Sequence, residues 1–195
     1  MTERNMTNIF ENDREFKEGI GAFIIALSEL EFGLVFLCAL TEFDIRMKDN
    51  YIMKYLGFPF EKKVQHLTEF IEQNLNEVKS TWDDLKLEIG QLNRERRFII
   101  HGFMSYSLPH ETITTQVKEK GKIATKQQSL ENIRKFTKRL YDLNSGKNGI
   151  NGEFNTVFTK SRIDQWNSLV NDENKIIYEV NGVVISDYKG VKGTN

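Results

Sequence analysis

The chain has 195 residues, which is long enough for one domain with a hydrophobic core, and no Pro-rich or Ser-rich linker divides it. Its 27 basic and 28 acidic residues leave a net charge of −1. Any binding to nucleic acid or to an anionic membrane must therefore depend on a local cluster of positive charge. A single cysteine, Cys38, excludes a disulfide framework, and no residues have zinc-ligand spacing, so we predict no metal and no other cofactor.

The first predicted helix runs from about Asp13 to Phe43, uninterrupted by proline and apolar nearly all round. Residues 20–40 are hydrophobic enough for a membrane span, but Glu29 and Glu31 lie near the middle, where a carboxylate is costly in lipid. We therefore expect a buried helix of a soluble bundle, in a cytoplasmic protein that has no membrane partner.

Two further helices precede a change of pattern. Turn-forming residues interrupt the chain at Lys48–Asn50 and at Gly57–Pro59. The spacing of apolar residues then predicts a second helix from about Phe60 to Gln73. Ser80 is the predicted N-cap of a third helix. The apolar stripe of that helix extends it to between Ser105 and Pro109.

The following segment changes from helical to β character. Residues Thr112–Gln127 are β-branched and polar, which predicts a surface β-hairpin folded about Lys120–Gly121. Ser129 is expected to cap a fourth helix that ends near Leu143. The glycine-rich loop at 144–152 lacks the Lys-Ser or Lys-Thr pair of a phosphate-binding P-loop.

The end of the chain predicts a short helix around Arg162–Val170 and a second hairpin that turns at Asn181–Gly182. These elements together indicate a single domain over residues 1–195 with its core at about 13–143, the rest being loop, short helix and hairpin. The predicted fold class is all-α: a bundle of four to five helices with two accessory β-hairpins.

Two charged residues fall in apolar stripes. Arg96 occupies the slot that follows Leu92 by four residues in the third helix, and Glu31 lies between Leu27 and Leu34 in the first. A buried charge without a partner costs several kcal/mol, so we predict that Glu31 and Arg96 form an interhelical pair. The alternative is that the aliphatic stem of Arg96 carries its guanidinium to the edge of the bundle.

Arg94, Arg97 and His101 share the opposite face of the third helix. Cations beside an imidazole favour its neutral form, which can accept a proton near pH 7, and they also attract the non-bridging oxygens of a phosphodiester. A lone exposed or structural histidine is the alternative. His66 and His110 have no comparable setting, and we predict no catalytic role for either.

The stretch at 96–102, Arg-Arg-Phe-Ile-Ile-His-Gly, resembles the signature of the HEPN superfamily (higher eukaryotes and prokaryotes nucleotide-binding). That signature is an arginine, usually followed by a polar residue, with a histidine four to six residues beyond the arginine. A long first helix with an internal acid at 28–31 and the hairpin at 112–127 are also similar to members of the family. The resemblance covers roughly residues 16–143.

The resemblance implies a metal-independent endoribonuclease in which two protomers pack their motif helices together around one cleft. By position, Arg96 would bind phosphate, Arg97 would take the place of the polar neighbour, and His101 would transfer protons. Glu31 would orient Arg96 at the wall of the cleft. The commonest family motif has asparagine where this chain has Arg97, and relatives without activity serve as dimerisation or binding modules.

We therefore predict a homodimeric endoribonuclease, acting as a toxin or an anti-phage effector, with RNA as its substrate and an antitoxin or another protein as a further partner. Arg94 and the hairpin lysines Lys118, Lys120, Lys122 and Lys126 are candidates for contacts with the RNA backbone. One alternative is a non-catalytic HEPN-like module that binds a partner or a nucleotide. The other is a structural protein whose arginine cluster is a set of solvent-exposed charges without a binding role.

Overall fold

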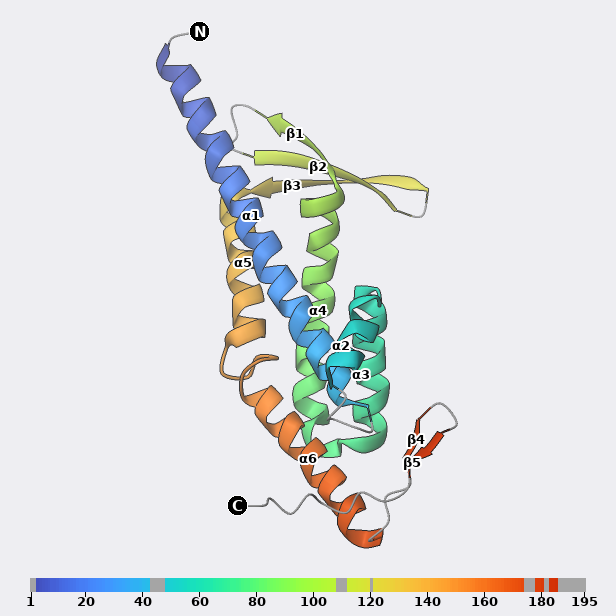
Figure 1. Ribbon diagram of the computed structural model, residues 1–195. Coiled ribbons are helices and arrows are strands. Elements are labelled where there is room, and N and C mark those ends of the chain that lie inside the picture. Colours follow the sequence, from blue (N-terminus) through green and yellow to red (C-terminus); the bar gives the residue numbers. More distant parts are fainter. Residues whose placement is uncertain are drawn as a thin grey trace.

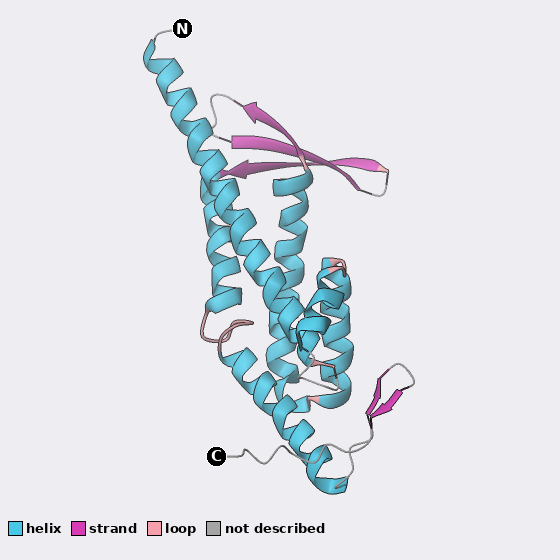
Figure 2. Cartoon of the chain, in the orientation of Figure 1, coloured by secondary structure: helices cyan, strands magenta, loops and turns pink. Residues whose placement is uncertain are grey.

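The computed structural model describes residues 3–42, 48–107, 112–119, 121–173, 178–180 and 183–185. Its helices are α1 (Glu3–Leu40), α2 (Lys48–Leu56), α3 (Phe60–Asn74), α4 (Asn76–His101), α5 (Leu130–Ser145) and α6 (Glu153–Glu173). Its strands are β1 (Phe103–Ser107), β2 (Thr112–Glu119), β3 (Lys122–Ser129), β4 (Tyr178–Val180) and β5 (Val183–Ile185). Helices dominate the described chain (Figure 1 and Figure 2), which confirms a mainly helical fold, although the described residues contain six helices and not four to five.

Helix α1 runs along the whole bundle. Phe23, Leu30, Leu34 and Leu37 are completely buried on its inner side, where α5 packs along one flank and α2 and α3 along the other (Figure 1). The segment Arg14–Leu40 is long and apolar enough to cross a membrane by length and composition alone. However, 61% of its most apolar window is buried inside the structure, as expected for a core helix.

Helix α4 begins at Asn76, about one turn before the predicted N-cap, and ends at His101. Gly102 follows with an extended backbone, and β1 begins at the next residue. A Cβ atom on Gly102 would lie 2.5 Å from the carbonyl oxygen of Phe98, so this passage from helix into strand requires glycine. The prediction that the helix continues to 105–109 is therefore wrong.

Other helices also differ from the sequence prediction, and α1 begins at Glu3 and not at Asp13. Helix α2 was not predicted, and α6 begins at Glu153, well before the expected start near Arg162. Aromatic packing explains the early start of α6: Phe154 stacks on Trp82 of α4, with ring centroids 5.8 Å apart. The indole Nε1 of Trp82 in turn donates to Thr68 Oγ1 of α3 at 3.0 Å, so α3, α4 and α6 meet at this residue.

Strands β1, β2 and β3 form an antiparallel sheet in that order, and it lies across the end of α4 (Figure 1). Gly121 has a φ of +80°, which suits glycine at the turn between β2 and β3. Ile113, Thr115 and Gln128 are buried on the face that packs on α4 and α5. The predicted hairpin at 112–127 is confirmed, whereas its third strand, β1, was not predicted.

Two local predictions from turn and cap chemistry are also confirmed. Ser129 caps α5, because its side chain accepts a hydrogen bond from the backbone nitrogen of Asn132 at 3.1 Å. Strands β4 and β5 pair antiparallel, as expected for the second hairpin. The turn residues Asn181 and Gly182 lie outside the described residues.

The predicted ion pair between Glu31 and Arg96 is wrong. Glu31 Oε1 lies 2.6 Å from Lys63 Nζ, so α1 pairs with α3 and not with α4. The Lys63 side chain is only 2% exposed, and that of Glu31 is 34% exposed. Two adjacent lysines at 62 and 63 look equally polar in the sequence, and only the packing of α3 shows that the second one points inward.

Candidate functional site on α4

One side of α4 faces solvent along its C-terminal half. We call it the α4 outer face; its residues follow one another at spacings of three and four, and all are exposed: Leu87, Gly90, Arg94, Arg97 and His101. The buried residues Ile89, Leu92 and Ile99 lie on the other side of the helix. The predicted grouping of two arginines and a histidine is therefore present.

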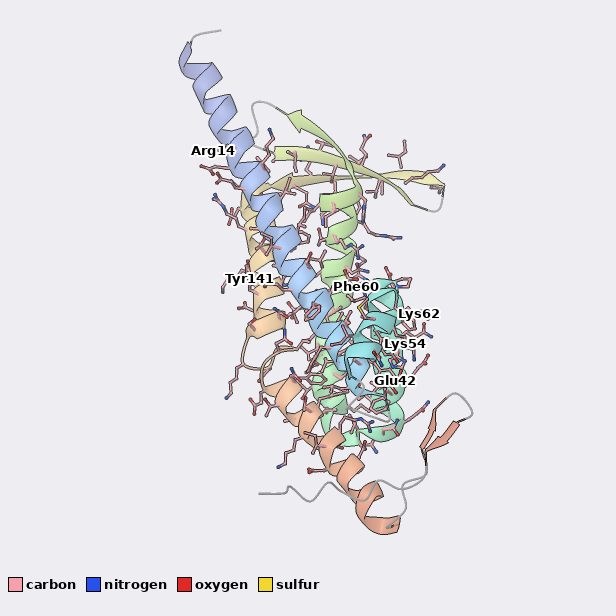
Figure 3. All side chains as sticks on the ribbon, viewed as in Figure 1. Arg14, Glu42, Lys54, Phe60, Lys62 and Tyr141 are labelled. Carbon is pink, nitrogen blue, oxygen red and sulfur yellow. The ribbon has the colours of Figure 1, made fainter. Side chains whose placement is uncertain are left out.

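Arg96 lies away from this group, on the side of α4 next to α3. It is half-buried, and its Nη1 donates to Asn93 Oδ1 at 3.4 Å. Its guanidinium carbon lies 5.8 Å from the ring centroid of Phe60, at the start of α3 (Figure 3). The position of Arg96 is thus fixed by a helix turn of α4 and by an aromatic ring of α3.

Glu61 of α3 interacts electrostatically with Arg96 and Arg97, and sequence reasoning missed it. Asn93 Nδ2 donates to Glu61 Oε1 at 2.9 Å. This hydrogen bond, a further one from the backbone of Glu61 and the charges of Arg96 and Arg97 hold the pKa of the Glu61 carboxyl below its ordinary value. An acid in the first turn of a predicted helix was the available signal, but it gave no indication of the partner.

The hairpin lysines divide into two groups. Lys126 Nζ lies 2.6 and 2.5 Å from the carboxylate oxygens of Glu95, and the rings of Phe98 and Phe136 each lie 5.7 Å away. Lys126 lies on the inner face of the sheet, its side chain is 35% exposed, and its charge is paired with Glu95; that it contacts RNA stays a prediction. Lys118 and Lys122 are exposed near the end of the hairpin.

Of the predicted site residues, Arg94, Arg97 and His101 come together, whereas Arg96 stands to one side and Glu31 belongs to the ion pair of α1 with α3. Lys120 lies outside the described residues.

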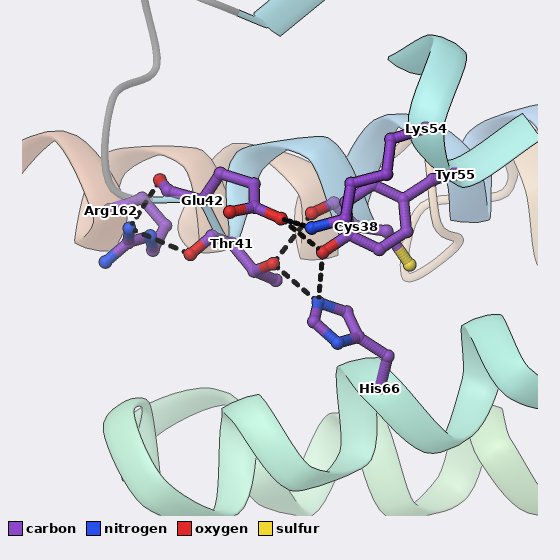
Figure 4. Close-up of polar contacts among 7 residues, drawn as sticks. All are labelled: Cys38, Thr41, Glu42, Lys54, Tyr55, His66 and Arg162. Atoms are coloured by element: carbon purple, nitrogen blue, oxygen red, sulfur yellow. Dashed lines mark hydrogen bonds and ion pairs between the residues drawn. The ribbon is translucent and has the colours of Figure 1, made fainter. Parts of the chain in front are cut away.

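A second polar cluster joins the end of α1 to α2 and α3 (Figure 4). Tyr55 donates its hydroxyl proton to Glu42 at 2.6 Å, and Thr41 donates its proton to the carbonyl oxygen of Cys38 at 2.7 Å. His66 Nε2 lies 2.7 Å from Thr41 Oγ1 and 3.0 Å from Tyr55 Oη. Because both hydroxyl protons are already used, this nitrogen must carry a proton and donate it.

Burial governs the titration of this second cluster. It lowers the pKa of His66, against the opposing charge of Glu42, and so favours the neutral imidazole. It also raises the pKa of Tyr55, and Glu42 adds to that rise. The Cys38 thiol is fully buried, with its pKa raised to about 12, so it is not a nucleophile near neutral pH.

Arg162 of α6 completes the second cluster by capping α1. Its Nε donates to the carbonyl oxygen of Leu40 at 2.9 Å, and its Nη2 to those of Thr41 and Glu42 at 3.3 and 3.1 Å (Figure 4). The last carbonyl groups of a helix lack partners within the helix, and the guanidinium supplies them. The groups of this cluster satisfy one another, so we assign it a structural role.

The α4 outer face therefore offers positive charge and an accessible imidazole. Among the described residues, no three His, Cys, Asp or Glu side chains are placed to hold a metal ion. No family model, no curated protein and no solved structure matches the chain. The chemistry of the α4 outer face is therefore interpreted from Arg94, Arg97 and His101 themselves.

Proposed function

We propose that this protein is a homodimeric, metal-independent endoribonuclease of the HEPN type that acts in the cytoplasm as a toxin or an anti-phage effector. The observation that supports this proposal is the α4 outer face, on which Arg94, Arg97 and His101 stand exposed within two helical turns. A phosphodiester needs cations around its non-bridging oxygens and a group that moves protons, and this face provides both.

The same face suggests how two chains meet. Leu87 is 66% exposed, and a Cβ atom on Gly90 would meet nothing within 4 Å. A second α4 can therefore approach closely at Gly90, with Leu87 covered by the contact. If the helices cross there, the segments that bear Arg94, Arg97 and His101 diverge from the crossing and line one composite cleft.

In the proposed reaction the 2′-hydroxyl oxygen of RNA attacks the adjacent phosphorus. His101 of one protomer takes the hydroxyl proton, and the second copy of His101 protonates the departing 5′ oxygen as the P–O5′ bond breaks. Arg94 and Arg97 hold the non-bridging oxygens, and Arg96, positioned by Asn93, approaches the phosphate from the side of α3. The products are a 2′,3′-cyclic phosphate and a 5′-hydroxyl.

The decisive experiment measures RNA cleavage in EDTA. We expect the wild-type protein to cut RNA, to leave DNA of the same sequence intact, and to produce 2′,3′-cyclic ends. His101→Ala should slow cleavage by about 10²-fold or more without lowering the melting temperature, because the side chain is exposed. Arg97→Ala should also slow it, whereas Lys135→Ala, an equally exposed cation on α5, should not.

Three results would contradict the nuclease: cleavage that survives His101→Ala, cleavage of DNA, or cleavage that EDTA abolishes. If the folded wild-type protein binds RNA or a partner but cuts nothing, the chain is instead the non-catalytic HEPN-like module. The charge of Glu61 near Arg96 and Arg97 favours that alternative, because it offsets part of the positive charge.

A further inference from the structure

An acidic groove lies on a different side of α4 from the α4 outer face, between the N-terminal half of α4, the end of α5 and the start of α6. Its volume is about 610 Å³. Buried apolar side chains, among them Leu85 and Phe154, form its floor. Five carboxylates line it: Glu77, Asp84, Glu88, Asp142 and Glu153.

Only part of this negative charge is offset by cations. Arg139 is the one cation that lines the groove, and it is bound to Glu88 at 2.8 Å and to Gln91 at 3.1 Å. Asp142 lies 3.9 Å from Lys138, and both are largely exposed, so that pair is weak. Among the described residues, no lysine or arginine forms an ion pair with Asp84.

Two of the other carboxylates have structural explanations. Glu77 and Glu153 lie in the first turns of α4 and α6, where an acid stabilises the helix dipole. Asp84 is in the interior of α4 and Asp142 is near the C-terminal end of α5, where an acid is unfavourable. An apolar floor and excess acid together fit an occupant that combines an apolar side chain with cations.

The chain carries such a group at the end of the β2–β3 hairpin, which we call the hairpin tip: Lys118, Lys122 and Ile123. Ile123 is 73% exposed, and it is the cross-strand partner of Lys118. Lys122, the next residue in the chain, lies on the other face of the hairpin opposite Glu119, so Ile123 has one ammonium group on its own face and a second on the reverse face. This arrangement complements the groove in both polarity and charge.

The hairpin tip cannot reach the groove of its own chain. Asp84 and Gly102 are both on or next to α4, which rises about 1.5 Å per residue, so they lie roughly 27 Å apart along its axis. The sheet and the start of α6 are accordingly seen towards opposite ends of α4 (Figure 1). Contact between the two surfaces therefore requires a second molecule.

We propose that the hairpin tip of one molecule docks in the acidic groove of another copy of the same chain. Ile123 covers the floor near Leu85 and Phe154, and the two lysines face Asp84 and Asp142. Tip and groove are different surfaces, so each joined molecule still offers one of each, and the association is head-to-tail and open-ended. It involves none of the residues of the α4 outer face.

A charge-swap series tests this contact, with Leu87→Asp as the background so that the α4 outer face does not contribute. Sedimentation of this parent should show a mass that rises with protein concentration and falls as salt is added. Lys118→Glu/Lys122→Glu, and separately Asp84→Lys/Asp142→Lys, should each weaken association by about tenfold or more. Both pairs of changes in one chain should restore it.

The controls separate this contact from general charge effects and from misfolding. Lys135→Glu/Lys160→Glu makes the same change of net charge at two other exposed positions and should leave association intact. If Asp84→Lys/Asp142→Lys lowers the melting temperature, Asp84→Asn/Asp142→Asn replaces it and should still weaken association. A parent that stays monomeric, or a folded fourfold variant that does not regain association, would overturn the proposal. No RNA is present, so neither result bears on the nuclease.

Discussion

The ion pair between Glu31 and Lys63 joins two charges in unequal surroundings. Lys63 is almost completely buried, whereas Glu31 keeps about a third of its side chain in contact with water. Removal of the acid leaves an ammonium group in the core without a partner. Removal of the lysine leaves a carboxylate that water can still hydrate. The two removals should therefore lower the free energy of unfolding by different amounts.

We predict that Glu31→Ala lowers the free energy of unfolding by about 3 kcal/mol, and that Lys63→Met lowers it by much less. The double variant Glu31→Ala/Lys63→Met should recover most of the loss, because no charge is then left unpaired. Urea titrations of the four proteins measure these differences. Equal losses for the two single variants would show that the burial of Lys63 does not govern the pair.

Arg96 shows what residue patterns can and cannot predict. Its place in an apolar stripe correctly indicated a half-buried position that needs polar partners. Those partners are Asn93, one turn away on α4, and the Phe60–Glu61 segment of α3, more than thirty residues earlier. The packing angle between α3 and α4 determines which residues these are, and the spacing of residues within one helix carries no information about that angle.

At the level of elements, the cap that Arg162 places on α1 links the last described helix to the first. The three carbonyl groups that it contacts belong to Leu40, the last residue of α1, and to the two residues that follow it. Burial lowers the pKa of the guanidinium, but arginine stays protonated at any ordinary pH, so the cap does not depend on pH.

Arg162→Ala should lower the free energy of unfolding by about 3 kcal/mol, because buried carbonyl oxygens lose their donors. Arg162→Lys should recover only part of this, because one ammonium group cannot reproduce the planar fork of a guanidinium. Thermal melts followed by circular dichroism are sufficient to measure both. Arg134→Ala removes an exposed pair with Glu15 and serves as the control; a similar loss there would refute the importance of the cap.

The elements that sequence periodicity predicted well are those whose ends are set locally. Ser129 begins α5 with its own side chain, and the glycine at the β2–β3 turn supplies its own conformation. The elements that were missed depend on distant partners: β1 pairs with β2, and α6 begins where Phe154 meets Trp82. When a distant partner stabilises a strand or helix, the sequence of that segment alone gives little indication of it.

For the whole molecule, the α4 outer face predicts a two-fold dimer. Sedimentation should show that the wild-type protein is at least dimeric, and Leu87→Asp should weaken that dimer because it puts a charge into the contact. Met53→Asp introduces the same charge at a position that is 71% exposed on α2, and it should have no effect. A wild-type monomer at the concentrations of the cleavage assay would refute the composite cleft.

The passage from α4 into β1 has a mechanical consequence. Gly102 connects helix α4 directly to strand β1, and no larger residue fits there without contact with the backbone at Phe98. The sheet is also tied to α4 by the ion pair of Lys126 with Glu95. His101 is the last residue of α4. A displacement of the hairpin would therefore reach α4 at two places, at His101 through the chain and at Glu95 through the ion pair, and both lie close along the helix to the exposed arginines Arg94 and Arg97.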